Sequence, residues 1–168
     1  MQVPSKDIME KENGGAIASD EIRSIIGPVL TTTGNNGKRM VESILKMVKN
    51  DPDLYLKPTE HGFHVCMKLN GEEIKLVQVW GRLDQAKSDI IETRRQWLPE
   101  SLQMGNENYR TIAQLFLTAN FNPTGGKYCN YRLNFDDERK MQFDDQVLNK
   151  VEKAIVGLKQ VIKDRSEQ

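Results

Sequence analysis

Alternation of apolar and polar residues predicts a β-hairpin in the first half of the chain. Residues 63–69 alternate in this way, as a strand with one face on a core requires. The dipeptide Asn70-Gly71 follows, and it favours a two-residue type I′ turn because both central positions of that turn need a positive φ. Residues 74–80 are rich in apolar and β-branched residues and provide the partner strand.

A second alternating region, in the later half of the chain, predicts a β-meander. Residues 112–121 and 128–135 flank the turn Asn-Pro-Thr-Gly-Gly at 122–126, and an acidic turn follows at 136–139. The first of these runs is ambiguous, since residues 109–121 also fit a helical period. We favour a strand for residues 112–121 because residues 128–135 supply a well-formed partner.

Helical spacing of apolar residues predicts three longer helices. They cover residues 38–49, 82–97 and 145–163, and a shorter helix is expected at 19–26. Helices and hairpins in this order predict an α+β fold. We expect an antiparallel sheet of two hairpins or a meander, with the helices packed mainly on one face.

Length and charge limit the classes of protein to consider. With 168 residues the chain suits a single domain, which we place at residues 18–168 after a flexible N-terminal tail at residues 1–17. Lys plus Arg (24) equals Asp plus Glu (24), so the basic excess typical of nucleic-acid-binding proteins is missing. We therefore do not expect a nucleic-acid partner, although a local basic patch stays open as an alternative.

Cysteine content and hydropathy indicate a reduced, cytoplasmic protein. The chain has only Cys66 and Cys129, too few for the disulfide framework of a small secreted domain. The first residues lack the apolar region of a signal peptide, and no apolar run has the length of a membrane span. We expect a cytoplasmic location and no membrane partner.

His61, His64 and Cys66 form the one cluster of soft metal ligands in the sequence. Two imidazoles and a thiolate suit zinc, and a catalytic site would leave one position open for water. No fourth ligand follows at a characteristic spacing, so these residues also fit the polar side of a half-exposed strand. A metal-dependent enzyme is thus one alternative function, but we assign no metal, no cofactor and no catalytic residue.

The segment from Gly34 to Arg39 (Gly-Asn-Asn-Gly-Lys-Arg) indicates a second alternative, nucleic-acid binding. A GXXG loop between helices allows close approach to a nucleic-acid backbone, and Lys38 and Arg39 would supply positive charge. The segment fails as a Walker A loop, because Thr32 and Arg39 stand where that motif needs Gly and Ser or Thr. The competing interpretation is a Gly/Asn turn that begins a helix.

An acidic turn and a polar strand face provide the candidate contact surface. Asp136, Asp137 and Glu138 share one turn, where carboxylates can bind a metal, form local hydrogen bonds or attract a basic partner. Tyr128 and Arg132 lie on the polar face of the preceding strand, and Tyr and Arg are enriched at binding hot spots.

Two further charged pairs are interpreted from their positions. Asp144 and Asp145 fit the cap and first turn of the last helix, where the helix dipole favours negative charge. Arg94 and Arg95 are the expected cationic counterpart of the strand face that carries Arg132.

Residues 125–138 (GGKYCNYRLNFDDE) resemble the later half of bacterial polymorphic-toxin immunity proteins of the contact-dependent inhibition type. The shared pattern is a strand, a Gly turn, and a strand with aromatic and acidic residues. The likeness extends from Leu115 to Asp145. It implies a non-enzymatic cytoplasmic protein that neutralises a toxin by blocking its active site or substrate surface.

The leading hypothesis is a non-catalytic protein-binding module, an immunity or inhibitor protein whose expected partner is a basic toxin domain. No complete set of nucleophile, base and stabilising groups is present in the sequence, which favours binding over catalysis. The contact candidates are Tyr128, Arg132, Asp136, Asp137 and Glu138. The partner's identity and the oligomeric state stay open.

Overall fold

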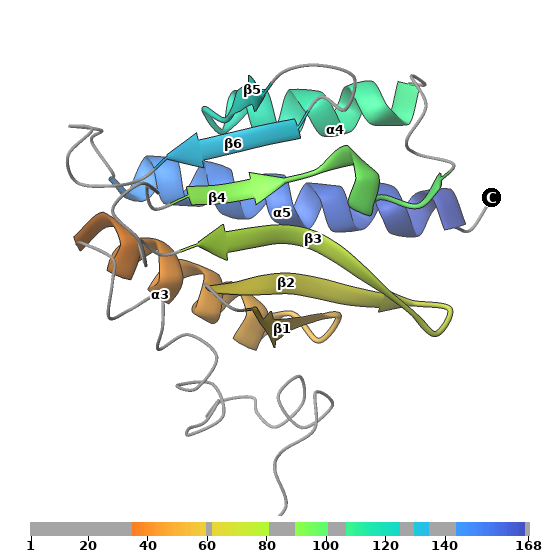
Figure 1. Ribbon diagram of the computed structural model, residues 1–168, viewed down its shortest axis with the longest axis horizontal. Helices are drawn as coiled ribbons and strands as arrows, with labels where there is room; N and C mark the ends of the chain where they lie inside the picture. Colours follow the sequence, from red (N-terminus) through yellow and green to blue (C-terminus); the bar gives the residue numbers. More distant parts are fainter. Residues whose placement is uncertain are drawn as a thin grey trace, which may run out of the picture.

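The computed structural model describes residues 35–59, 62–80, 90–100, 107–124, 130–134 and 144–166. Within them a six-stranded antiparallel sheet packs against three α-helices (Figure 1). The α+β fold predicted from the sequence is thus confirmed. The expected tail at 1–17, the short helix at 19–26 and the acidic turn at 136–139 lie outside the described residues.

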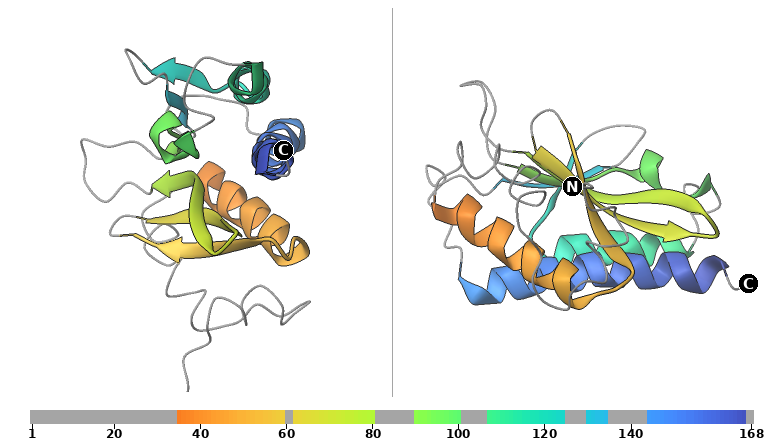
Figure 2. Two further views of the ribbon diagram at one scale, coloured as in Figure 1. Left: turned by 90° about the vertical axis from the view of Figure 1, so that its right-hand side faces the viewer. Right: turned by 90° about the horizontal axis from the view of Figure 1, so that it is seen from below.

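The sheet has the strand order β1-β2-β3-β4-β6-β5, and every neighbouring pair is antiparallel. Its strands are β1 (Leu54–Pro58), β2 (Gly62–Leu69), β3 (Glu72–Trp80), β4 (Ile90–Thr93), β5 (Asn122–Thr124) and β6 (Asn130–Asn134). The helices are α3 (Asn35–Asn50), α4 (Glu107–Thr118) and α5 (Asp145–Ser166), with a 3₁₀ turn, η2, at Arg95–Trp97. Figure 2 shows all three α-helices on the same side of the sheet.

The hairpin predicted in the first half is confirmed as β2 and β3. Asn70 and Gly71 join the strands with φ values of 53° and 83°, as a type I′ turn requires. At the other end of the hairpin, Gly62 lies against the backbone of Val79. A Cβ atom at Gly62 would stand 1.9 Å from the Val79 carbonyl oxygen, so only glycine fits there.

The helices predicted at residues 38–49 and 145–163 are confirmed as α3 and α5, which are four and three residues longer than expected. In α3 the apolar stripe of Met40, Val41, Ile44 and Val48 is buried against the sheet. Asp144 immediately precedes helix α5, and its Oδ1 accepts a hydrogen bond of 3.0 Å from the backbone N–H of Val147. The predicted capping role of Asp144 is therefore confirmed.

The strand predicted at residues 112–121 is wrong, because this segment is helix α4. Ile112 and Phe116 are buried together with Tyr109, which is the helical spacing that also fitted the sequence. Leu117, which a strand would bury, has 43% of its surface exposed. Strand β6 pairs with β4 on one edge and with β5 on the other. Residues 112–121, the partner expected from the sequence, are therefore not paired with it.

The helix predicted at residues 82–97 is also wrong over its described part. Residues 90–93 form β4, between β3 and β6, and η2 follows, while residues 81–89 lie outside the described residues. All four residues of β4 are buried. A central strand covered on both faces loses the alternation that identifies strands in a sequence, which explains the error.

A buried lysine on α5 forms ion pairs with the turn that precedes β1. Lys159, 9% exposed, donates hydrogen bonds to Asp51 Oδ2 (2.6 Å) and Asp53 Oδ2 (3.4 Å) in the turn between α3 and β1. Lys163 adds a 3.0 Å bond to Asp53, and this hydrogen bond is the main reason that the pKa of Asp53 lies below its ordinary value. These contacts fix α5 across the helical side of the sheet.

Candidate binding site on the second face of the sheet

A row of polar side chains crosses the sheet on the face where no described α-helix packs. Strand pairing places them opposite one another in the order Lys57, His64, Gln78, Glu92, Arg132 and Asn122. The residues that precede or follow them along β2, β3 and β4 (Phe63, Val79 and Ile91) point to the other face and belong to the core beneath the helices. The row therefore defines the second face of the sheet.

Glu92 is the centre of this row and is almost fully buried, with 1% of its side chain exposed. Its Oε1 accepts a hydrogen bond of 2.5 Å from Arg94 Nε. Its Oε2 accepts two from Arg132, at 2.8 Å from Nε and 2.5 Å from a terminal nitrogen. One buried carboxylate thus positions two guanidinium groups that come from different strands.

Two tryptophans flank these guanidinium groups. The guanidinium carbon of Arg94 lies 5.6 Å from the ring centre of Trp80 and 5.4 Å from that of Trp97. Arg132 lies 5.9 Å from the ring centre of Trp80. These distances suit cation–π attraction. We refer to Trp80, Glu92, Arg94, Trp97 and Arg132 as the Trp–Arg cluster.

His64 extends the cluster toward β1. Its ring meets Trp97 edge to face, with 5.0 Å between ring centres, and only 7% of the residue is exposed. Burial, with a smaller effect of the Lys75 charge, lowers the pKa of His64 from 6.5 to about 4, so the imidazole is neutral at pH 7. Its Nδ1 has no hydrogen-bond partner in the described part of the chain.

The Trp–Arg cluster is chemically suited to binding anionic or carboxylate groups. Glu92 uses the Nε–H of Arg94, and within the described residues no group accepts from the terminal NH₂ groups of Arg94. The side chains of Arg94 and Arg132 are 29% and 35% exposed, so a partner can reach them. A planar guanidinium fixed in this way can hold a carboxylate through two parallel hydrogen bonds.

The sequence-predicted contact residues divide between described and undescribed parts of the chain. Arg132 lies in β6 and belongs to the Trp–Arg cluster, together with Arg94. Arg95 instead lies over the Tyr109 ring, 4.2 Å from its centre, and contacts α4. Tyr128, Asp136, Asp137 and Glu138 lie outside the described residues.

Sequence reasoning missed Glu92 and the two tryptophans as parts of this site. The signal was present in Ile-Ile-Glu-Thr at residues 90–93, a short β-branched run that contains one carboxylate. If that run is read as a strand, its alternation places Glu92 and Arg94 on the same face. The pairing of β4 with β6 in the structure then sets Glu92 opposite Arg132. The helix predicted for this segment removed that relationship.

The structure also describes most residues of the two alternative sites, the proposed metal ligands and the Gly34–Arg39 segment. His64 and Cys66 are buried in β2, not half-exposed as expected, and His61 lies outside the described residues. In the described part of the chain, no group of three or more His, Cys, Asp or Glu side chains can hold a metal ion. Residues 35–39 form the first turn of α3 rather than a loop, and Arg39 pairs with Asp145 at 3.1 Å.

No protein-family model, curated protein or solved structure matches this chain. Among the described residues, no helix combines the length and the apolar character needed to cross a membrane. Functional assignment therefore depends on the chemistry of the surfaces.

Proposed function

We propose that this chain is a non-catalytic binding protein, an immunity or inhibitor protein, and that its contact surface is the second face of the sheet. The observation that carries this proposal is the Trp–Arg cluster. Trp and Arg are the residues most enriched among interface hot spots, and here they lie together around one buried carboxylate.

Preorganisation supports a binding role. Glu92 holds Arg94 and Arg132 in position, so both side chains have already lost much of the conformational freedom that an interface would otherwise restrict. The tryptophan rings add rigid apolar area beside them. A surface of this kind can bind tightly with few contacts.

The partner that fits best is a toxin domain acting on nucleic acid. Such enzymes combine central carboxylates, which hold metal ions, with basic side chains that grip phosphates. Arg94 and Arg132 would pair with the carboxylates. The acidic residues Asp136, Asp137 and Glu138, which follow β6 in the sequence, would meet the basic rim. The resemblance to toxin immunity proteins favours the same partner.

The test uses the protein encoded by the adjacent gene as the binding partner. Both chains are purified, and calorimetry measures the dissociation constant for the unmodified protein and for Arg94→Ala. We expect Arg94→Ala to weaken binding about 30-fold, which corresponds to a hot-spot loss of about 2 kcal/mol. Growth of cells that express the adjacent gene should be rescued by the unmodified protein and less well by the variant.

The matched control is Lys49→Ala, which truncates an exposed basic side chain in the last turn of α3, on the helical side of the sheet. It should leave the dissociation constant within about twofold of the unmodified value, as expected for a rim or non-contact charge. If Arg94→Ala binds as tightly as the control, the Trp–Arg cluster is not the contact surface. If the adjacent product is not toxic, the inhibitor assignment is wrong.

A further inference from the structure

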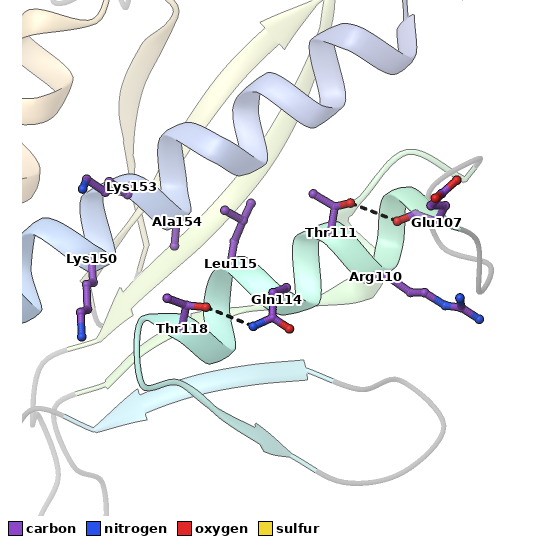
Figure 3. A pocket seen from close by; sticks show the side chains of 9 residues that line it. All are labelled: Glu107, Arg110, Thr111, Gln114, Leu115, Thr118, Lys150, Lys153 and Ala154. Atoms are coloured by element: carbon purple, nitrogen blue, oxygen red, sulfur yellow. Dashed lines mark hydrogen bonds between the residues drawn. The ribbon is translucent and has the colours of Figure 1, made fainter.

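A groove of about 570 Å³ runs between α4 and α5 (Figure 3). Both helices lie on the helical side of the sheet, whereas the Trp–Arg cluster lies on its second face. Leu115 and Ala154 lie where the two helices approach each other. The approach is close, since a Cβ atom at Gly157 would meet the Leu115 Cδ atoms at 2.8 and 2.9 Å. The floor of the groove is thus apolar and made by tightly packed helices.

One complete stripe of α4 faces this groove. The lining residues of α4 recur at helical spacing: Glu107, Arg110, Thr111, Gln114, Leu115 and Thr118. The buried stripe of the same helix, with Ile112 and Phe116, faces the core instead. Helix α4 therefore presents a second, partly apolar face.

The walls of the groove are positively charged on both sides. Arg110 stands on the α4 wall, and Lys150 and Lys153 stand on the α5 wall, against the single carboxylate of Glu107. Arg110 and Lys153 are exposed and Lys150 is half-buried. Within the described part of the chain, none of these three cations has an ion-pair partner. Their charge is available to a ligand that enters the groove.

We propose that this groove is a second binding site, which takes an acidic amphipathic helix from a partner protein. Two packed helices leave a groove that a third helix fills by interdigitating side chains. The apolar stripe of the incoming helix would lie on Leu115 and Ala154, and carboxylates on its two flanks would pair with Arg110 on one wall and Lys150 and Lys153 on the other.

The dimensions agree with this occupant. From Glu107 to Thr118 the groove follows α4 for about 16 Å, which matches about three turns of a bound helix. A nucleic-acid backbone is a poorer fit, because the apolar floor offers nothing to phosphates and sugars. The site goes beyond the proposed function, since it lies on the helical side and uses none of the Trp–Arg cluster.

The experiment uses a fluorescent synthetic peptide of about 14 residues, with leucines at i, i+3, i+4 and i+7 and glutamates on both flanks. Fluorescence anisotropy measures its dissociation constant for the full chain. The double variant Lys150→Glu with Lys153→Glu should weaken binding about tenfold or more. A peptide with glutamine in place of glutamate should bind as weakly to the unmodified protein, and added salt should weaken only the acidic peptide.

Matched controls separate this site from the proposed sheet-face site. Lys68→Glu makes the same charge change on an exposed strand position and should leave peptide binding unchanged, as should Arg94→Ala. Equal binding of the acidic and glutamine peptides, or no effect of the double reversal, would overturn the proposal. The proposal is also overturned if the peptide does not bind and the double variant instead loses binding of a single-stranded oligonucleotide. The same holds if the peptide does not bind and the double variant loses self-association of this chain.

Discussion

Replacement of Glu92 by glutamine keeps the size of the side chain and removes its charge. In the folded protein this leaves two guanidinium groups close together, with one amide oxygen in place of a carboxylate. The glutamine NH₂ group cannot accept from either arginine, so one of them loses its partner. We expect Glu92→Gln to destabilise the fold and to loosen both arginines.

The magnitude follows from burial and exposure. Breaking a buried ion pair by removing one partner costs about 3–5 kcal/mol, and a hydrogen bond to a charged group contributes about 1.5–3 kcal/mol. Glu92 is fully buried, but the side chains of Arg94 and Arg132 are 29% and 35% exposed, so water partly compensates them. The expected loss is therefore about 2 kcal/mol, or about 4–8 °C in melting temperature for a chain of this length.

Urea unfolding followed by circular dichroism measures this loss. The transition midpoint should fall while the slope with denaturant stays unchanged, because the buried area is the same. A double-mutant cycle with Arg132→Met should give a coupling free energy of about 1–2 kcal/mol between the two residues.

The exposed pair of Arg39 and Asp145 provides the control, with side-chain exposures of 43% and 93%. Asp145→Asn should cost no more than about 0.5 kcal/mol. If Glu92→Gln unfolds at the same urea concentration as this control, Glu92 does not carry the stabilising role that its burial indicates, and the reasoning about the cluster fails.

Three further predictions follow from single sites. The pKa of His64 is about 4 in the folded protein and 6.5 ordinarily, so the unfolded chain takes up the proton first as the pH falls. The contribution of His64 to the free energy of unfolding should be fully present above pH 6.5 and fall by about 3 kcal/mol toward pH 4, as measured by urea titrations. The variant His64→Leu should remove this pH dependence. Gly62→Ala should cost about 3 kcal/mol in the same assay, because its Cβ would collide with the Val79 carbonyl oxygen; a cost below 1 kcal/mol would contradict this. Lys159→Met should cost about 2 kcal/mol by leaving Asp51 unpaired, and an unchanged melting temperature would show that water replaces the lysine.

The β2–β3 hairpin and helix α5 were predictable from the sequence, whereas the structures of residues 90–93 and 109–121 were not. The hairpin turn at Asn70-Gly71 and the stripe of α5 have a local physical cause that the sequence displays directly. Residues 109–121 fit both a helical and a strand pattern. Packing of Ile112 and Phe116 into the core decides between them, and that packing depends on distant elements.

The candidate site was predictable only in part for the same reason. Alternation in the sequence predicted that Arg132 lies on the polar face of its strand, and the burial pattern of β6 agrees with that prediction. Its partner Glu92 lies forty residues earlier in the chain, on a strand buried on both faces. Only the strand order, which brings β4 beside β6, reveals that the two residues share one face.

The ion pairs between α5 and the turn before β1 have a consequence for how the chain folds. Lys159 and Asp51 are 108 residues apart in sequence, and Lys163 and Asp53 are 110 apart. Contacts of such separation close long loops, whose entropy is lost before the contact stabilises anything, and they slow folding. During synthesis α5 leaves the ribosome after every other described element, so α3 and β1 acquire their final neighbour only then. Translation of α5, rather than of the sheet, is expected to be the step that completes the domain.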